Sequence, residues 1–168
     1  LHEIVRQGRK DLAMAGHTST HDFQILCAGQ CISSCDAAYI VGLEARGLSK
    51  NARRQIQSGR IKICEWTNAA LALRLRAAAM GVSFIPCRVM LGTDTFEHSA
   101  AVEIECPFTG QKYAALPALW PDVAIIHVHR ADVTGNAQID GLTTADVELS
   151  QAAKHVIISS EEIVPEEY

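Results

Sequence analysis

Short apolar runs rich in β-forming residues alternate with helical patterns along this chain of 168 residues. Each run is only a few residues long and is bounded by turn residues, which is typical of strands. The runs predict strands at 11–16, 36–42, 61–65, 83–86, 123–129 and 156–159. The run 123–129 is so continuously apolar that we predict burial on both of its faces, as in a parallel sheet covered on both sides.

Helical periodicity occupies the stretches between these strands. It predicts helices at 51–58, 68–80 and 144–155. The second helix is the clearest, because Leu71 and Leu75 recur on one face of it. Thr67 or Asn68 can cap its first turn, and Gly81 can end it.

The order of strands and helices predicts an α/β fold, with an open, largely parallel sheet and helices on both faces. Between Cys87 and Leu119 the pattern changes to short segments with Gly and Pro, which predict hairpins or active-site loops on that core. No internal repeat or linker interrupts the sequence, so we expect a single domain over 1–168. Because the chain opens on Leu1 without an initiator Met, we also expect it to be a fragment of a longer chain.

Composition narrows the range of partners. The formal net charge is −4 and aromatic residues make up only 5%, without a basic stripe, so we expect no nucleic acid partner. No apolar run reaches the roughly 18 residues of a membrane span, so we expect no membrane partner. The charged opening LHEIVRQGRK differs from a secretory signal, and we predict a cytoplasmic protein.

Six cysteines raise the question of a metal site or a disulfide framework. Cys27, Cys31 and Cys35 follow a C-x3-C-x3-C spacing, and Cys64, Cys87 and Cys106 stand alone. Zinc sites and iron–sulfur clusters use other spacings, and disulfide scaffolds are usually short and loop-rich. We therefore interpret all six as structural thiols of a reducing compartment and predict that the protein binds no metal.

Polar residues that follow the predicted strands form the candidate site, because open α/β sheets bind ligands beyond the carboxyl ends of their strands. The rule selects His17, Thr18, Ser19, Glu65, Thr67, Asn68, His129 and Arg130. Hydroxyl and N–H groups at 17–19 suit an anion, and the last pair suits a carboxylate or a phosphate. Thr67 and Asn68 are alternatively helix caps.

Glu65 is the candidate catalytic residue, since it ends one strand directly before a helix. It can be a cleft carboxylate that orders substrate, or that acts as a base or nucleophile. Equally, it can accept N–H bonds at the start of the helix. His127 lies inside an apolar run and is expected to be a hydrogen-bonded core residue. Asp132 and Asn136 flank Gly135 in a predicted turn.

Four segments, taken in order, resemble the α subunits of family I coenzyme A-transferases. They are KICEWTNAALALRLRAAAMGVSFIP (62–86), VEIECPFTGQKYAALPALWPDVAIIHVHRAD (102–132), HRADVTGN (129–136) and SEEIVPEEY (160–168). The second is similar to the glutaconate CoA-transferase-like branch. The family's N-terminal Gly-Gly-Phe turn and its C-terminal segment do not appear in this chain.

The resemblance implies the CoA-transferase, ribose-phosphate-isomerase-like fold and a hetero-oligomer of α and β subunits. In that family a carboxylate attacks an acyl-CoA thioester and forms a mixed anhydride. CoA then returns to give an enzyme–CoA thioester, which passes CoA to a free carboxylic acid. The nucleophilic Glu normally lies on the β subunit in a Ser-Glu-Asn-Gly-like motif, which this sequence lacks. The resemblance thus implies a β-subunit partner, acyl-CoA and carboxylic acid substrates, and coenzyme A as cosubstrate, with no tightly bound cofactor.

Two other functions remain open at this point. One is a CoA-thioester or ring-opening hydrolase on the same scaffold, in which water replaces the acceptor acid and a carboxylate of this chain does the chemistry. The other is a non-enzymatic effector-binding domain, because the fold also occurs in sugar-phosphate sensors.

Overall fold

The computed structural model describes residues 1–41 and 49–166, and the chain divides into two compact units. The first unit comprises Leu1–Leu71 and Pro86–Leu116, and the second comprises Ala72–Ile85 and Pro117–Tyr168. Each unit contains a sheet and a hydrophobic core of its own. The single domain over 1–168 stays a prediction.

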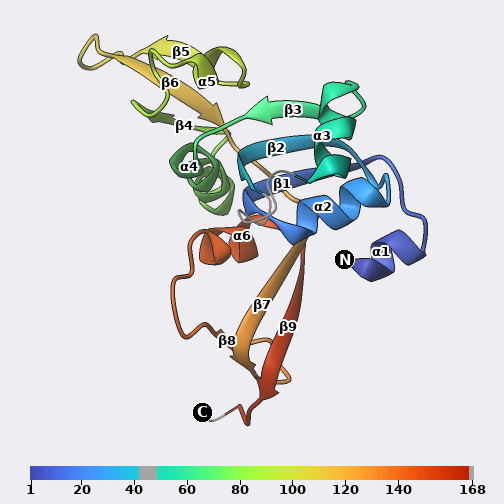
Figure 1. The fold of residues 1–168 in the computed structure, drawn as a ribbon. Helices are drawn as coiled ribbons and strands as arrows, with labels where there is room; N and C mark the ends of the chain where they lie inside the picture. The colour runs from blue at the N-terminus through green and yellow to red at the C-terminus, as the bar shows by residue number, and fades with distance from the viewer. Residues whose placement is uncertain (42–48, 167–168) are drawn as a thin grey trace. The chain divides into compact units, whose positions relative to one another are not determined.

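The first unit is built on a parallel sheet in which β2 lies between β1 and β3 (Figure 1). The strands are β1 (Leu12–Ser19), β2 (Ile32–Ile40) and β3 (Lys62–Glu65). All three were predicted, but β1 continues beyond residue 16 and β2 starts before residue 36. Gly42, the predicted end of the second strand, lies outside the described residues.

Helices α2 and α3 pack against each other beside this sheet (Figure 1). The helices of this part of the unit are α1 (His2–Arg6), α2 (His21–Ala28) and α3 (Lys50–Gln57). The sequence did not predict α2, whose apolar face of Phe23, Leu26 and Cys27 spans little more than one turn. These three residues are buried in one core cluster with Cys35 and Ala37 of β2.

A second sheet has the strand order β4-β6-β5. Its strands are β4 (Phe84–Cys87), β5 (Val102–Glu105) and β6 (Lys112–Pro117), and the short helix α5 (Asp94–Glu97) precedes β5. Strands β5 and β6 form an antiparallel hairpin. The hairpin predicted between Cys87 and Leu119 is therefore confirmed.

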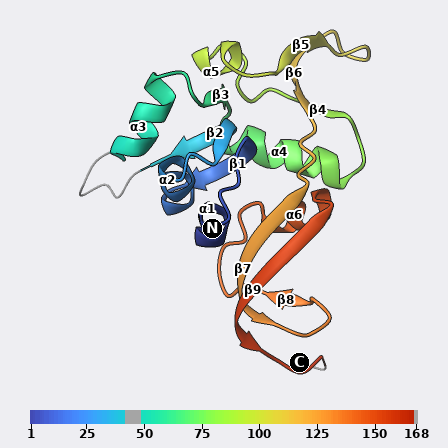
Figure 2. The same cartoon turned by 90° about the vertical axis from the view of Figure 1, so that its right-hand side faces the viewer.

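The second unit is built around β7, which pairs with β9 in parallel and with β8 in antiparallel direction (Figure 2). Its elements are β7 (Val123–Ala131), β8 (Ala137–Gln138), α6 (Asp146–Ala152) and β9 (His155–Ile163), together with most of α4 (Asn68–Ala79). Ile126 and Val128 form a buried cluster, against which Leu149 of α6 and Ile158 of β9 pack.

The prediction that β7 is buried on both faces is wrong for this chain. From Val123 to His129 its residues alternate between exposed and buried, with Val123 49% and Ile125 51% exposed. Strand alternation places His127 on the same exposed face, so it is no core residue. The expected hydrogen bond is present, since its Nδ1 lies 2.9 Å from Ser159 Oγ.

Strand directions confirm the predicted fold class. The pairs β1–β2, β2–β3 and β7–β9 are parallel, whereas β5–β6 and β7–β8 are antiparallel. Helices separate the parallel strands, and the sheets are open, as in an α/β protein. Within the described residues, no helix is both long and apolar enough to span a bilayer.

Candidate functional site

Strand register places Glu65, at the carboxyl end of β3, level with Gly16 of β1. Gly16 pairs with Ala37, and Ala37 pairs with Glu65 on its other side. Paired residues of parallel strands share a face, and two strand spacings amount to about 10 Å. The ends of β1 and β3 thus lie at one edge of the sheet, with β2 between them.

His17, Thr18 and Ser19 are the last residues of β1 and do not form a loop after it. The strand continues because β2 reaches Ile40, which pairs with Ser19. Ser19 is buried, and its side chain explains Gly16, since a Cβ atom there would collide with Ser19 Oγ. Thr18 is exposed, and its hydroxyl lies 3.3 Å from His17 Nδ1. Among these three residues, Thr18 offers its hydroxyl to solvent at the edge.

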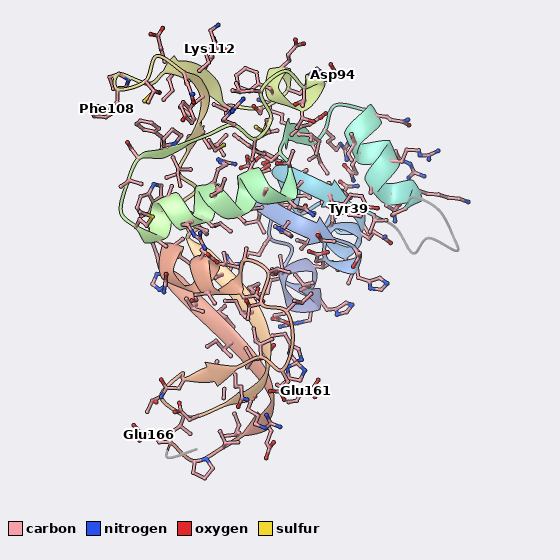
Figure 3. All side chains as sticks on the ribbon, turned by 90° about the vertical axis from the view of Figure 1, so that its left-hand side faces the viewer. Tyr39, Asp94, Phe108, Lys112, Glu161 and Glu166 are labelled. Carbon is pink, nitrogen blue, oxygen red and sulfur yellow. The ribbon has the colours of Figure 1, made fainter. Side chains whose placement is uncertain are left out.

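Tyr39 is a residue of this edge that the sequence analysis missed. It pairs with Thr18 across β1 and β2, and strand alternation places it on the face of Ala37 and Glu65. Its side chain is 50% exposed (Figure 3). The predicted strand continued to residue 42, so Tyr39 was treated as strand interior. Only the pairing of β1 with β2, which the sequence does not show, places it beside Thr18.

Glu65 itself is exposed at the end of β3, and its backbone is fixed on two sides. Its N–H donates to His98 O at 3.1 Å, so the segment after α5 lies beside it. The next residue, Trp66, donates from its N–H to Ala37 O at 2.8 Å. No residue in the described part of the chain forms a side-chain hydrogen bond or ion pair with the Glu65 carboxyl group. Glu65 therefore presents its carboxyl group from a fixed backbone position at the carboxyl end of β3.

Thr67 caps helix α4, which was one of its two predicted roles. Its Oγ1 accepts a hydrogen bond from Ala70 N at 3.1 Å, and its carbonyl accepts from Leu71 N at 2.9 Å. Asn68 is the first helical residue and is exposed. Because Thr67 satisfies these N–H groups, Glu65 is not needed as the cap.

His129 and Arg130 belong to the second unit, at the end of β7, and both are already bonded. Arg130 Nη1 donates to Asp140 Oδ2 at 2.8 Å, and its Nε lies 3.5 Å from Glu162 Oε2. Asp140 N donates to His129 Nδ1 at 3.1 Å, so this nitrogen is an acceptor. Arg130 is thus paired with two acidic side chains, and these contacts of His129 and Arg130 stabilise the end of β7.

Asp132 organises the predicted turn after β7. Its carboxylate accepts from the N–H and hydroxyl of Thr134, each at 2.8 Å, and from Asn136 Nδ2 at 2.7 Å. These hydrogen bonds lower the pKa of Asp132 to about 2, and the bond from Asn136 has a larger effect than that from Thr134. Gly135 has φ +98°, as the turn prediction required. Asp132 and Arg130 also line a small pocket of about 180 Å³.

The six cysteines, all within the described residues, are free thiols. Burial raises the pKa of Cys27 to about 11 and, together with the Asp36 charge, that of Cys35 to about 12. Cys106 differs, because a hydrogen bond from the Thr109 side chain and two backbone bonds lower its pKa. Interpreting Cys106 as an ordinary structural thiol was therefore wrong. Within the described part of the chain, no group of three or more His, Cys, Asp or Glu side chains is arranged to hold a metal ion, and the expected absence of metal stays a prediction.

In open α/β folds, the polar groups at the carboxyl ends of parallel strands are where small ligands usually bind. A sequence model of the coenzyme A transferase family matches residues 1–168. The chain therefore belongs to the coenzyme A transferase family.

The chain is similar in sequence to two proteins that are named as A subunits of CoA-transferases. The chain is 34% identical over 167 residues to the A subunit of 3-oxoadipate CoA-transferase from Pseudomonas knackmussii, and 29% identical over 182 aligned positions to the A subunit of glutaconate CoA-transferase from Acidaminococcus fermentans. It is 54% identical over 166 residues to an uncharacterized protein of Archaeoglobus fulgidus. The matches cover 97–98% of this chain but only 37–59% of those proteins.

Solved structures confirm the predicted CoA-transferase fold. The crystal structure of the Acidaminococcus fermentans glutaconate CoA-transferase superposes with a TM-score of 0.89 at 27% identity, over 98% of this chain and 57% of that one. A variant of the decarboxylase AibA/AibB superposes with a TM-score of 0.86 at 31% identity, over 98% of this chain and 63% of that one. One fold thus carries two chemistries among these relatives.

Proposed function

We propose that this chain is the α-type subunit of a CoA-transferase, which moves CoA from an acyl-CoA to a free carboxylic acid. In this proposal the glutamyl-CoA thioester forms on a partner β subunit, and coenzyme A is a cosubstrate. The observation that carries the proposal is the match of nearly the whole chain to two proteins named as the A subunits of CoA-transferases. The free thiols agree with the cytoplasm as the proposed location.

Glu65 is the residue of this chain that we assign to the reaction. Its exposed carboxyl group lies at the sheet edge, and the bonds to His98 and Ala37 fix its backbone. A carboxyl group on a fixed backbone can orient the acyl-CoA toward the nucleophile of the partner, because correct positioning of the reacting groups contributes to rate.

Neighbouring side chains at the two strand ends are assigned to substrate binding. Thr18 and Tyr39 are paired, exposed and on one edge with Glu65, so their hydroxyls can donate to an acyl carboxylate. His17, Ser19 and Asn68 belong to the same edge. His129 and Arg130 remain proposed substrate contacts of the second unit, with Arg130 acting only if it exchanges Asp140 or Glu162 for the ligand.

The proposal is tested by assaying the purified chain with and without its partner. The chain alone should transfer no CoA from an acyl-CoA to glutarate or adipate, whereas the reconstituted complex should. Mass spectrometry of the complex, incubated with acyl-CoA alone, should find CoA attached to the partner. Turnover by a chain verified to be free of partner would refute the two-subunit assignment.

A second candidate is decarboxylation, favoured by the similarity to the AibA/AibB decarboxylase. In that case the complex should release CO₂ from a carboxylated acyl-CoA without any acceptor acid. Measuring CO₂ release and CoA transfer in one preparation separates the two functions, because each product forms in only one of them.

A further inference from the structure

The segment from Ser49 to Cys64 is strongly basic. It contains five Lys or Arg residues and no Asp or Glu, although the whole chain has a net charge of −4. Half of the segment is helix α3, from which nitrogen-tipped side chains project into solvent (Figure 3). A cluster of like charges raises the free energy of the folded state, so a bound anion here would stabilise it.

A groove between α2 and α3 collects two of these cations. It has a volume of about 490 Å³, and among the described residues that line it only Arg54 and Arg60 are charged. Its polar lining also includes Ser58, together with Asn51 and Gln30, whose exposed side-chain amides can donate hydrogen bonds. A volume of this size is within the usual range for small-molecule sites.

The floor of the groove has its own hydrogen bonds already satisfied. Buried Gln55 donates from Nε2 to Cys27 O at 3.1 Å, and Gln30 N also donates to that carbonyl. Gln55 O accepts from Ser58 Oγ and from Arg60 N, each at 3.1 Å. The carbonyls near the ends of both helices are thus occupied, which reduces their repulsion of an anion.

The Arg60 guanidinium is held by a hydrogen bond, whereas Arg54 has no ion-pair partner among the described residues. Arg60 Nη1 donates to Gln30 Oε1 at 3.0 Å, which uses one of its five N–H donors. Arg54 lies on α3, whereas Arg60 lies in the turn that follows this helix. Two such forks on one groove match the oxygens of phosphate, which arginine binds through paired hydrogen bonds.

The groove lies away from the candidate active site. Gln30 lies two residues before β2 and Arg60 two residues before β3, so both are near the amino ends of these parallel strands. Glu65 and Thr18 lie at the carboxyl ends of β3 and β1. A ligand in the groove would therefore occupy a second site, at the opposite edge of the same sheet.

We propose that the α2–α3 groove binds a phosphorylated small molecule, whose phosphate oxygens are held by Arg54 and Arg60. The inference does not depend on the proposed function, since it concerns a different edge of the sheet and involves no chemistry at Glu65.

Isothermal titration of the purified protein with inorganic pyrophosphate and with AMP tests the site. Both probes should bind, and Arg54→Gln or Arg60→Gln should each weaken binding by about tenfold or more, the effect of losing one charge-assisted bond. Arg53→Gln is the matched control, because it removes the same charge from α3 at an exposed position outside the groove lining. It should leave the affinity within about twofold of the unchanged protein.

Each other outcome overturns the proposal. Absence of binding at millimolar probe would do so, as would an equal loss in the Arg53 variant, which would indicate a diffuse charge effect. Equally tight binding of glutarate would show that the groove does not select phosphate. Circular dichroism of the three variants, which change exposed side chains only, confirms that each is folded.

Discussion

Trp66 donates from its indole Nε1 to Asp36 Oδ1 at 2.6 Å, which ties the residue after Glu65 to the middle strand of the first sheet. The Trp66 side chain is buried, and the backbone N–H of Trp66 also donates to Ala37 O. These two bonds fix where β3 ends and therefore where Glu65 stands. The position of the candidate catalytic group thus depends on its buried neighbour Trp66.

Replacing Trp66 with Phe should weaken both the fold and the reaction. The ring is largely kept, but the indole donor is lost, so the free energy of unfolding should fall by about 1–3 kcal/mol. Urea unfolding followed by far-ultraviolet circular dichroism measures this change, and CoA transfer by the reconstituted complex should fall with it. Trp120→Phe is the control, because Trp120 is 51% exposed. Equal effects of the two substitutions would contradict the anchoring role of Trp66.

Asp132 should make the turn after β7 sensitive to acid. Its pKa in the folded protein is lowered to about 2, so the folded state binds this proton less readily than the unfolded chain does. The resulting stability is fully present above the ordinary pKa near 3.8 and is lost as the pH falls through about 2. Asp132→Asn should therefore be less stable than the unchanged protein at pH 7, and the difference should shrink as the pH falls below about 4.

Chemical unfolding at a series of pH values measures that difference. Asp94→Asn, at an exposed position on α5, should show no comparable convergence with the unchanged protein at low pH. A stability difference that stays constant from neutral pH to pH 2 would mean that Asp132 stabilises the turn without its charge.

Cys106 should be the most reactive of the six thiols. It precedes the tip of the β5–β6 hairpin, where Phe108 is 93% exposed (Figure 3), and the hydrogen bond from Thr109 lowers its pKa. A lower pKa means more thiolate at a given pH and hence faster alkylation. Iodoacetamide at pH 7 should modify Cys106 first, and Cys27 and Cys35, buried with raised pKa values, only after unfolding.

Thr109→Val tests the cause of this reactivity. Removal of the hydroxyl should raise the pKa of Cys106 and shift the pH dependence of its alkylation to higher pH. An unchanged profile would assign the reactivity to exposure alone. Elemental analysis of the same preparation should find no stoichiometric zinc or iron.

Strand positions were predictable because each apolar run is bounded by turn residues, and all six predicted strands are present. Helix α2 was missed because Phe23, Leu26 and Cys27 give only about one turn of periodicity. The error on β7 has a different cause, since Val123 and Ile125 are apolar yet exposed in this chain. An apolar pattern reports what a residue prefers, whereas exposure also depends on what covers the sheet.

The candidate site was predicted in part for the same reason. The rule of strand ends selected Glu65 and Thr18, which lie at the carboxyl ends of β3 and β1, and their role as a site stays a prediction. It could not identify Tyr39, since only the pairing of β1 with β2 reveals that this residue stands beside Thr18. Nor could it show that Arg130 is already matched by Asp140, which lies ten positions further along the chain.

Glu65→Gln separates the two roles that this carboxyl group can have. If it orients the substrate while the partner supplies the nucleophile, the reconstituted variant should still form the enzyme–CoA thioester, more slowly. The loss of one oriented hydrogen bond costs about 1–3 kcal/mol, or roughly 5- to 150-fold in rate. If Glu65 is itself the reacting group, activity should fall about a thousandfold or more and no thioester should be trapped. Borohydride reduction followed by peptide mapping locates the adduct, and Glu97→Gln, an exposed acid on α5, controls for the change of charge. An adduct on Glu65 in the unchanged complex would place the covalent chemistry on this chain and reject the partner as its carrier.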